Sequence, residues 1–434
     1  MELPVKFTER MKTLLQDEYD DFKKCLDSSE YKALRVNMRK FAEFTKEKLP
    51  FELEAHPFVK NGFYYDLNDE PGKSPYHAAG LFYIQEPSAM MPAFYLEAAP
   101  HERVLDLCAA PGGKTTQIAE MMENTGLLVS NEINKDRARI LSENIERMGF
   151  GNVVCTNMAP DGLSKKFIEF FDRICVDAPC SGEGMFRKND EAVENWSEEN
   201  VKMCAARQAE ILDEADKMLR PGGRMVYSTC TFSREENEDT INAFVESHKE
   251  YEVLKEVRFF PHKFKGEGHF VAVLKKNGEE GTLNKDLRPV KGLSEKEIKT
   301  YREFEEKYLK VKLSGEFFKM GDTIYLAPEN MPDIKKLYVL RSGLILGEVK
   351  KDRFEPDHAF ALYLLPSMMK DEYVTVIGED SDAAAKYLHG ETIEDESGVK
   401  GYHLITIDGI SVGWGKSDGR IIKNHYPKGL RTKY

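Results

Sequence analysis

Between Arg103 and Lys276 the chain alternates short apolar segments with longer amphipathic ones, and this alternation leaves few folds open. The apolar segments are "RVLDLC", "LLVSNEI", "NVVCTN", "DRICVDA" and "RMVYSTC". One intervening segment, "NKDRARILSENIERMG", has the marks of a helix, with Asn134 as its N-cap and Gly149 after its end. Strands that alternate with helices predict βαβ units, and therefore a Rossmann-like α/β fold with a parallel sheet.

The segments on either side of this region follow other patterns. Helical periodicity and one short strand, "KALRVNM", occupy most of the first hundred residues. A polar stretch that begins at Lys276 is typical of a linker, and short strands with glycine turns follow it. We therefore predict domains at residues 1–99, 100–276, 277–366 and 367–434, the third of which includes the linker.

Composition excludes several classes of protein. The chain of 434 residues contains no run of 18 apolar residues, so we expect no membrane span. The start, "MELPVKFTERMK", has no apolar core of the kind found in secretory signals. The seven cysteines form no C-x-x-C, which argues against a disulfide framework and against a metal site. These observations favour a cytoplasmic protein.

The stretch "VLDLCAAPGGKTT" predicts a strand, a loop of small residues and the start of a helix. Backbone N–H groups at a helix start favour polar or anionic ligand groups. The loop is not a P-loop, because Cys108 stands where the first glycine is needed, and G-x-G-x-x-G is also absent. It could hold an adenosine-containing ligand that carries a carboxylate. Glu132 ends the following strand, where an acid can accept both hydrogen bonds of a ribose diol.

Two cysteines follow neighbouring strands of the predicted sheet. Asp177 and Cys180 come after one strand and Cys230 ends the next, so all three are expected at the carboxyl edge of the sheet, facing one cleft. A thiolate that adds to carbon 6 of cytosine makes carbon 5 nucleophilic enough to take a methyl group. A nearby carboxyl or thiol can then help to protonate the ring and assist release. Cys108 lies in the cofactor loop, and we give it no chemical role.

The motifs "DLCAAPGGKT", "DAPCSGEG" and "YSTCT", in this order, resemble the Sun-type RNA (cytosine-5)-methyltransferases, which use S-adenosyl-L-methionine. "GEGMFRK" and "RFFPHKFKGEGHFVAV" are similar to the bacterial ribosomal RsmF (YebU)-like group of this family. The resemblance implies that Cys230 is the nucleophile, that Cys180 helps to release the product, and that Asp177 lies near the methyl donor and the cytosine edge. It also implies that Lys114 reaches the active site.

The same resemblance implies a set of cofactor-binding residues. Many members place an Asp near the adenine after the third strand, whereas this chain has "VVCTNMAPDG", so Asn157 is our substitute. Asp177 and Glu132, the latter on the ribose hydroxyls, complete the set. The loop residues expected to bind S-adenosyl-L-methionine are Cys108, Ala109, Ala110, Pro111, Gly112, Gly113 and Lys114.

The family fold is a seven-stranded methyltransferase domain whose final antiparallel strand would be "GHFVAVLKK". An N-terminal α/β RNA-binding domain and C-terminal β-rich PUA-like domains accompany it. The net charge of −13 argues weakly against broad nucleic-acid binding, but the chain carries only cations after Asp418. We expect those cations to contact RNA phosphates and Trp414, Tyr426 and Tyr434 to stack on bases. The cations are Arg420, Lys423, Lys428, Arg431 and Lys433.

The function expected from this resemblance is methylation of carbon 5 of cytosine in 16S ribosomal RNA, free or in the 30S particle, through a covalent cysteine–cytosine intermediate. Nothing demands more than a monomer, and no membrane partner is expected. The same chemistry on tRNA or 23S ribosomal RNA is the alternative. A nucleotide-dependent oxidoreductase is disfavoured by the missing G-x-G-x-x-G. A noncatalytic RNA-binding factor is disfavoured by the presence of both cysteines, Asp177 and the intact loop.

Overall fold

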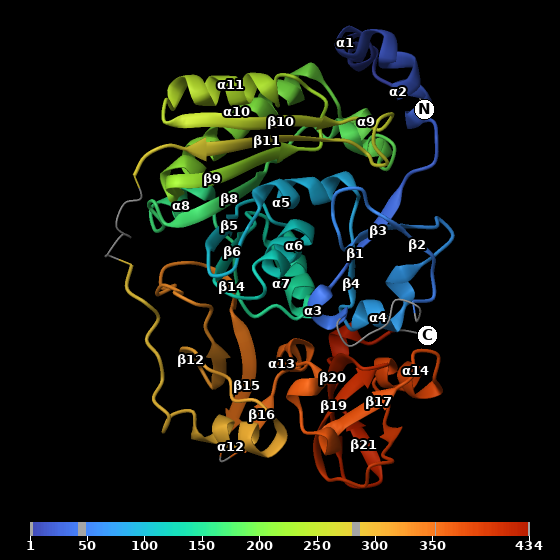
Figure 1. The fold of residues 1–434 in the computed structure, drawn as a ribbon, viewed down its shortest axis with the longest axis vertical. Coiled ribbons are helices and arrows are strands. Elements are labelled where there is room, and N and C mark those ends of the chain that lie inside the picture. Colours follow the sequence, from blue (N-terminus) through green and yellow to red (C-terminus); the bar gives the residue numbers. More distant parts are fainter. Residues whose placement is uncertain (1–2, 42–48, 280–286, 352, 433–434) are drawn as a thin grey trace.

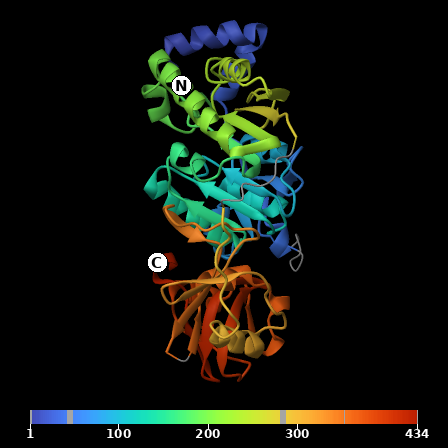
Figure 2. The ribbon, with the colours of Figure 1, turned by 90° about the vertical axis from the view of Figure 1, so that its left-hand side faces the viewer.

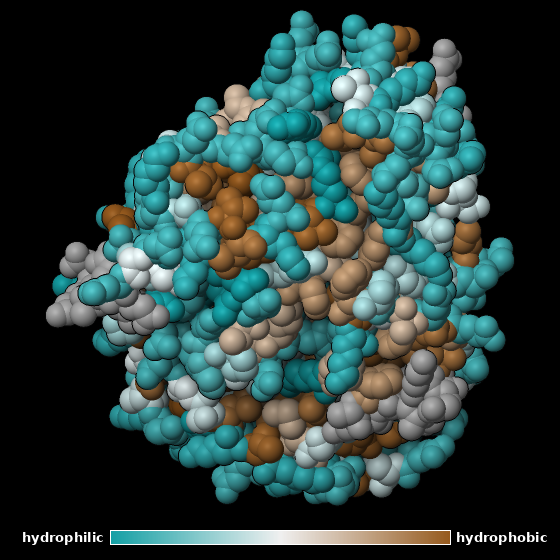
Figure 3. All heavy atoms as spheres, turned by 45° about the horizontal axis from the view of Figure 1, so that its top comes forward, coloured by the Kyte–Doolittle hydropathy of each residue, from teal (hydrophilic) through white to brown (hydrophobic). Residues whose placement is uncertain are grey.

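The computed structural model describes residues 3–41, 49–279, 287–351 and 353–432. Except for β14 (Val339–Ser342), which joins the central sheet, the C-terminal strands, orange to red, form a tier beneath that sheet in both ribbon views (Figure 1, Figure 2). Figure 3 shows a mostly hydrophilic face on which hydrophobic atoms gather in separate patches. None of the helices in the described ranges is long and apolar enough to cross a membrane.

The central sheet has eight strands in the order β10-β11-β9-β8-β5-β6-β7-β14. Five neighbouring strands, β9, β8, β5, β6 and β7, pair in parallel, as the alternation of strands and helices predicts. The antiparallel final strand is also confirmed, because β11 pairs antiparallel with both β9 and β10. The strands are β5 (Arg103–Asp106), β6 (Leu127–Asn131), β7 (Val153–Thr156), β8 (Phe171–Asp177), β9 (Leu219–Thr229), β10 (Tyr251–Phe259), β11 (His269–Lys276) and β14 (Val339–Ser342).

The eighth strand, β14, is an addition to the seven-stranded sheet that the resemblance implies. It lies far downstream in the sequence and pairs antiparallel with β7, with Val339 opposite Thr156. Its backbone occupies the edge of β7 that would otherwise present unpaired N–H and C=O groups. The region that follows β11 in the sequence is thereby joined to the central sheet by strand pairing.

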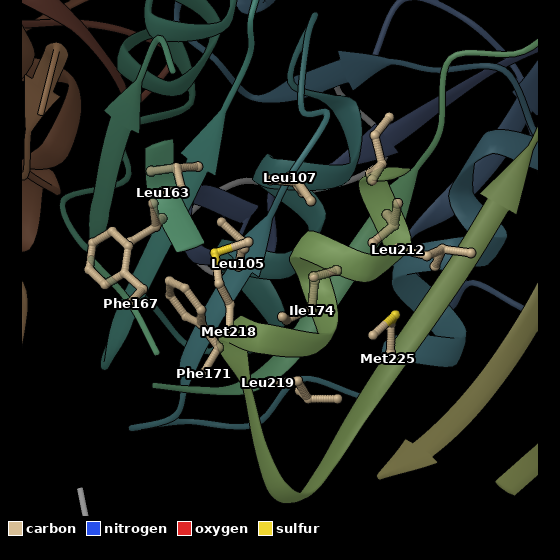
Figure 4. Packing of buried hydrophobic residues seen from close by; sticks show 14 of the residues in the cluster. Leu105, Leu107, Leu163, Phe167, Phe171, Ile174, Leu212, Met218, Leu219 and Met225 are labelled. Atoms are coloured by element: carbon tan, nitrogen blue, oxygen red, sulfur yellow. The ribbon is translucent and has the colours of Figure 1, made fainter. Parts of the chain in front are cut away.

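Helices cover both faces of the central sheet. Consecutive residues of a strand point to opposite faces, and β5 shows this because Val104 and Leu105 belong to different buried clusters. Figure 4 shows the Leu105 cluster, in which Leu212 and Met218 of a long helix pack over the strands. Each such fully buried side chain contributes about 1.5–3 kcal/mol. The helices are α5 (Met91–Leu96), α6 (Gly113–Met121), α7 (Lys135–Met148), α8 (Pro160–Ser164), α9 (Asp190–Glu194), α10 (Glu198–Met218) and α11 (Glu238–Ser247).

The N-terminal part contains a helical pair and a four-stranded antiparallel sheet in the order β2-β3-β1-β4. The helical pair packs through Phe7 and Phe22 against Phe186, Trp196 and Phe232, which flank the ends of β8 and β9. The elements are α1 (Val5–Leu15), α2 (Tyr19–Leu26), β1 (Lys32–Val36), α3 (Met38–Phe41), β2 (Leu53–Ala55), β3 (Gly62–Tyr65), α4 (Pro75–Ala78) and β4 (Phe82–Ile84).

The C-terminal part holds two further sheets, in the orders β12-β13-β15-β16 and β17-β19-β20-β21-β18. Trp414 of β20 and Phe360 of α13 belong to one buried cluster that both sheets share. The elements are α12 (Lys299–Tyr308), β12 (Phe317–Met320), β13 (Thr323–Leu326), β15 (Leu344–Lys350), β16 (Arg353–Pro356), α13 (His358–Tyr363), β17 (Val374–Ile377), α14 (Asp382–His389), β18 (Ile393–Glu394), β19 (Gly401–Ile407), β20 (Ile410–Ser417) and β21 (Ile421–Asn424).

The expected stacking role of the C-terminal aromatic residues is wrong for two of the three. Trp414 is 2% exposed and its Nε1 donates to the carbonyl of Asp357 at 2.8 Å. Tyr426 is 5% exposed and packs its ring against Tyr387. Both rings are core residues, because burying so large an apolar surface outweighs presenting it to a ligand. Tyr434 and Lys433 lie outside the described residues.

Candidate active site

The predicted cofactor loop runs from the end of β5 to the start of α6. Gly112 takes a left-handed φ of 114°, which glycine adopts without strain, and it forms the N-cap of α6. Side chains of α7 hold the loop from outside: Arg137 donates to the carbonyl of Ala110 at 2.8 Å and Asn144 to that of Pro111 at 2.9 Å. The loop therefore has a fixed shape, with the first N–H groups of α6 at its end.

Glu132 and Asn157 lie side by side at the ends of β6 and β7. Asn157 donates from Nδ2 to the backbone carbonyls of Glu132, at 2.7 Å, and Ile133, at 2.8 Å. In this orientation the Asn157 amide nitrogen already donates to protein carbonyls. Its side-chain carbonyl is then the acceptor that an adenine amine would need. The Glu132 carboxylate, 3% exposed, accepts from the backbone N–H of Asn134 at 2.8 Å.

Asp177, at the end of β8, is held from two sides. Lys114 Nζ lies 2.8 Å from its Oδ2, while Ser228 Oγ donates to Oδ1 at 2.7 Å and His269 Nε2 lies 3.4 Å from Oδ1. Burial by itself would raise the pKa of Asp177, but the Lys114 ammonium and His269 hold that pKa well below its usual range. Asp177 is therefore an ionised acceptor, and Lys114 reaches the strand ends as expected.

The two thiols face each other across the ends of β8 and β9, which are adjacent in Figure 1. Cys180 Sγ lies 3.3 Å from Cys230 Sγ, and both residues are partly exposed. The parallel register places Asp177 opposite Ser228, which brings both turns to the same edge of the sheet. The hydrogen bond with Cys230, together with burial, raises the pKa of the Cys180 thiol.

Two buried acids brace these turns, and the sequence analysis did not single them out. Glu236, which follows Cys230, accepts from the backbone N–H of Ser181 at 3.0 Å. Glu183, which follows Cys180, accepts from the backbone N–H of Phe232 at 2.9 Å. Each turn thus supplies the carboxylate that fixes the other. The only signal in the sequence is that each acid lies within six residues of a cysteine.

A buried arginine of the N-terminal sheet also reaches α6, the helix that follows the predicted cofactor loop. Arg35 of β1 donates to Thr116 Oγ1 at 2.6 Å and to the carbonyl of Gly113 at 3.3 Å, and it pairs with Glu120 at 2.6 Å. Its side chain is 0% exposed. The N-terminal sheet therefore fixes the first two turns of α6, a function that "ALRVN" does not reveal by pattern.

The residues that we predicted from the sequence share one edge of the sheet. The residues that follow five neighbouring parallel strands are the loop from Cys108 to Lys114, Glu132, Asn157, Asp177, Cys180 and Cys230. Burial raises the pKa of the Cys108 thiol, which fits its lack of a chemical role. Across the described ranges no group of three or more His, Cys, Asp or Glu could hold a metal ion. The arrangement can offer a thiolate, a second thiol and a fixed carboxylate to one substrate.

Family models match the chain along most of its length. Residues 93–275 match the 16S rRNA methyltransferase RsmB/F model, and residues 3–87 match the N-terminal domain of 16S rRNA methyltransferase RsmF. Residues 303–364 match the RsmF rRNA methyltransferase first C-terminal domain, and residues 374–432 match the methyltransferase RsmF PUA domain.

Individual relatives agree with these models. The chain is 34% identical to ribosomal RNA small subunit methyltransferase F of Vibrio vulnificus, over 99% of this chain and 97% of that protein. It is 33% identical to the protein of the same name from Shewanella loihica, over 88% and 84%. A solved methyltransferase homolog from Pyrococcus horikoshii is 27% identical with a TM-score of 0.55, over 62% of this chain and 94% of that one. NSun6 from the same organism, solved with SFG, is 25% identical with a TM-score of 0.55, over 64% and 99%.

Proposed function

Because the chain belongs to the RsmF family of 16S rRNA methyltransferases, we propose that it methylates carbon 5 of cytosine in 16S ribosomal RNA. The observation that carries this proposal is the pair of thiols 3.3 Å apart at adjacent strand ends, beside a carboxylate that is already paired with Lys114. Two thiols at one site are what an attack on carbon 6 and a later release require.

We assign the nucleophile to Cys230 and the release step to Cys180. As the Cys230 thiolate bonds to carbon 6, the ring loses its aromaticity and carbon 5 becomes the nucleophile that takes the methyl group. Solvent at this partly exposed edge then takes the proton on carbon 5, and the electron pair of that C–H bond reforms the ring double bond while Cys230 leaves as a thiolate. Cys180 remains a thiol because its pKa is raised, so it can donate to the departing sulfur 3.3 Å away.

Asp177 has an electrostatic role in this scheme. Its low pKa means that it accepts hydrogen bonds and does not protonate the ring. A cytosine amine is the donor that would suit it, and Lys114 and Ser228 fix the carboxylate in place for that bond. Of the two groups that we considered for protonation, the carboxyl and the thiol, the low pKa of Asp177 leaves the thiol.

S-adenosyl-L-methionine, which supplies the electrophilic methyl group when bound, fits the residues at this edge. Glu132 offers a carboxylate for a ribose diol, Asn157 offers a carbonyl for an adenine amine, and residues 108–114 offer small side chains and helix N–H groups. The relative NSun6 was solved with SFG, an analogue of this cofactor.

The substrate class follows from the family and from the site. A base within a helix cannot reach thiols at a strand edge, so the target cytosine must leave its stack. Every residue of the proposed site comes from one chain, so a monomer suffices, and we expect it to act in the cytoplasm on free 16S RNA or the 30S particle. Bisulfite mapping of ribosomal RNA from a deletion strain identifies the modified position and separates 16S RNA from 23S RNA and tRNA.

Two variants test the assignment of the thiols. Cys230→Ala should abolish methylation and leave S-adenosyl-L-methionine affinity nearly unchanged. Cys180→Ala should permit attack and methyl transfer but stall release, which leaves an RNA–protein adduct visible in denaturing electrophoresis. Substantial turnover by Cys230→Ala would remove it as the nucleophile, and an adduct trapped by that variant would exchange the two roles.

A further inference from the structure

Two thiols that lie 3.3 Å apart have no intrinsic reason to take different roles. Both follow parallel strands of one sheet, and both are partly exposed. An attack on cytosine nevertheless requires one of them to be a thiolate while the other keeps its proton. The difference must come from the groups around each sulfur.

Glu236 lies against the turn that carries Cys180. It comes six residues after Cys230, and the chain folds back so that its side chain, 0% exposed, contacts the turn that carries Cys180. Its Oε2 accepts from the Ser181 N–H at 3.0 Å and from Gln208 Nε2 at 2.8 Å, and its Oε1 accepts from Ser181 Oγ. All three partner groups donate to the carboxylate, and these hydrogen bonds oppose the rise in the pKa of Glu236 that burial causes.

The contacts of Glu236 fix Cys180 from both sides in the sequence. Ser181, directly after Cys180, is held by two bonds to the carboxylate. Pro179, directly before Cys180, is held through Gln208, whose Nε2 donates to its carbonyl at 3.0 Å. Glu236 therefore anchors the turn at the position that sets where the Cys180 sulfur points.

Glu236 also places a negative charge close to the Cys180 sulfur. That charge, after Cys230 and burial, contributes to the raised pKa of Cys180. Arg10 of α1, which pairs with Glu235, lowers the pKa of Glu236 through its charge. The titratable groups that face Cys180 or Glu236 are Cys230, Tyr227 of β9, Cys204 of α10, Glu183 and Arg10.

We propose that Glu236 is the positioning residue that decides which thiol attacks: it anchors the Cys180 turn, and its charge keeps Cys180 protonated while Cys230 becomes the thiolate. The proposal rests on the proposed function, because it concerns the same site. It acts through Cys180 and requires no contact between Glu236 and the substrate. The proposal is carried by one juxtaposition: the buried Glu236 carboxylate, held by hydrogen-bond donors, lies beside Cys180, one of the two paired thiols.

Thiol alkylation tests the proposal without any need for methylation. Iodoacetamide is added at limiting dose to the full-length protein between pH 6 and pH 9, and peptide mass spectrometry gives the initial rate at each cysteine. We expect wild-type Cys230 to react roughly tenfold faster than Cys180 at neutral pH, because the thiolate is the form that alkylates. Glu236→Gln should reduce that ratio to about threefold or less, chiefly by speeding alkylation of Cys180.

Two further variants make the outcome decisive. Glu183→Gln removes the other buried carboxylate that bridges the same two turns, and it should leave the ratio near that of wild type. Glu236→Asp keeps the charge and should keep the ratio even if shortening the side chain lowers turnover, so a misfolded Glu236→Gln does not end the test. An unchanged ratio in Glu236→Gln, or an equal change in Glu183→Gln, overturns the proposal.

Failure of this proposal and failure of the proposed function are distinguishable. If wild-type protein does not methylate cytosine, the function fails, whatever the alkylation ratio is. If wild-type protein methylates cytosine but the ratio does not depend on Glu236, only the role of Glu236 fails. Glu236→Gln that methylates at the wild-type rate, with the wild-type pH profile, also counts against it.

Discussion

Two carboxyl groups on neighbouring strands show how the surroundings of a residue decide its charge. Asp177 keeps a low pKa because Lys114 lies 2.8 Å from it. Asp106, at the end of β5, is 0% exposed, and its partner is the neutral hydroxyl of Thr115, 2.7 Å away. Burial therefore raises the pKa of Asp106 to about 7. The same residue type is ionised in one position and gains a proton near neutral pH in the other.

The raised pKa of Asp106 predicts a pH-dependent stability. Between about pH 4 and pH 7 the folded protein keeps a proton that the unfolded chain has released. Raising the pH through this window therefore lowers the free energy of unfolding, by roughly 1.4 kcal/mol per pH unit, and the loss levels off above about pH 7. Asp106→Asn should remove most of this slope in urea titrations. Asp161→Asn, at an exposed carboxyl, should keep the wild-type slope.

The Lys114–Asp177 pair predicts a second effect at this scale. Lys114→Met should leave the partly buried Asp177 carboxylate without its ammonium partner, at a cost of about 1–3 kcal/mol in unfolding free energy. It should also raise the pKa of Asp177 and lower kcat, because the acceptor for the substrate is no longer held ionised. Urea midpoints and single-turnover rates measure the two effects. Lys165→Met breaks an exposed ion pair and serves as the control. If Lys114→Met is as stable as this control, the Lys114–Asp177 pair does not stabilise the fold as we expect.

The sequence was sufficient to place the two thiols and residues 108–114 at one edge of the sheet, because each lies at a strand end that the chain pattern marks. It was insufficient for Glu236 and Glu183, since acids in "GEGMF" and "REENED" look like surface residues until the two turns meet. It was wrong for Trp414, because an aromatic residue next to cations satisfies the pattern of an RNA contact and of a core equally well.

At the scale of elements, the β14–β7 pairing is the part of the fold that local pattern could not predict. Strand periodicity identifies a strand but does not choose its partner, and β14 joins the central sheet from beyond its last strand, β11. The contact is reinforced by Arg341 of β14, 4% exposed, which pairs with Glu146 of α7. The backbone N–H of Asn157 also donates to the carbonyl of Tyr338 at 2.9 Å. The C-terminal part thus supports a proposed cofactor residue.

This docking predicts the effect of breaking the Arg341–Glu146 pair. Arg341→Gln should lower the free energy of unfolding by about 3–5 kcal/mol, because Glu146 is left partly buried without a cation. It should also weaken S-adenosyl-L-methionine binding, since the strand that holds Asn157 is loosened. Lys350→Gln, at an exposed pair with Glu355 in the same part of the chain, should change the urea midpoint little. Equal behaviour of the two variants would contradict a docking role for Arg341.

At the scale of the whole molecule, the N-terminal sheet packs against the C-terminal sheet that holds β17 to β21. Leu34 and Phe82 of the N-terminal sheet share a buried cluster with Ile405 and Ile422 of the C-terminal sheet. Tyr76 donates to Asp408 Oδ2 at 2.7 Å across the same contact. The PUA domain is therefore packed against the domain that holds the cofactor helix through Arg35, so any RNA bound at the C-terminal sheet has a defined position relative to the thiols.

The distribution of charge predicts how that RNA is held. The chain carries a net charge of −13, so RNA phosphates should meet the protein where cations gather. Four cations in and around β20 and β21 are exposed: Lys416, Arg420, Lys423 and Lys428. Because Trp414 and Tyr426 are buried, we expect this surface to bind phosphates and not to stack on bases.

Replacing these four cations by alanine should weaken binding of 16S RNA and flatten its salt dependence. Each lost phosphate contact should reduce the slope of log K against log salt by about 0.7 for single-stranded RNA, hence by nearly 3 if all four bind phosphate. The control replaces four exposed lysines on or beside α10, α11, β10 and β11, namely Lys202, Lys249, Lys255 and Lys275, and these elements lie far from β20 and β21 in Figure 1. Its slope should stay close to that of wild type. Equal slopes in the two variants would show that the C-terminal sheet reads shape or hydrogen bonds, and that its charge does not position the RNA.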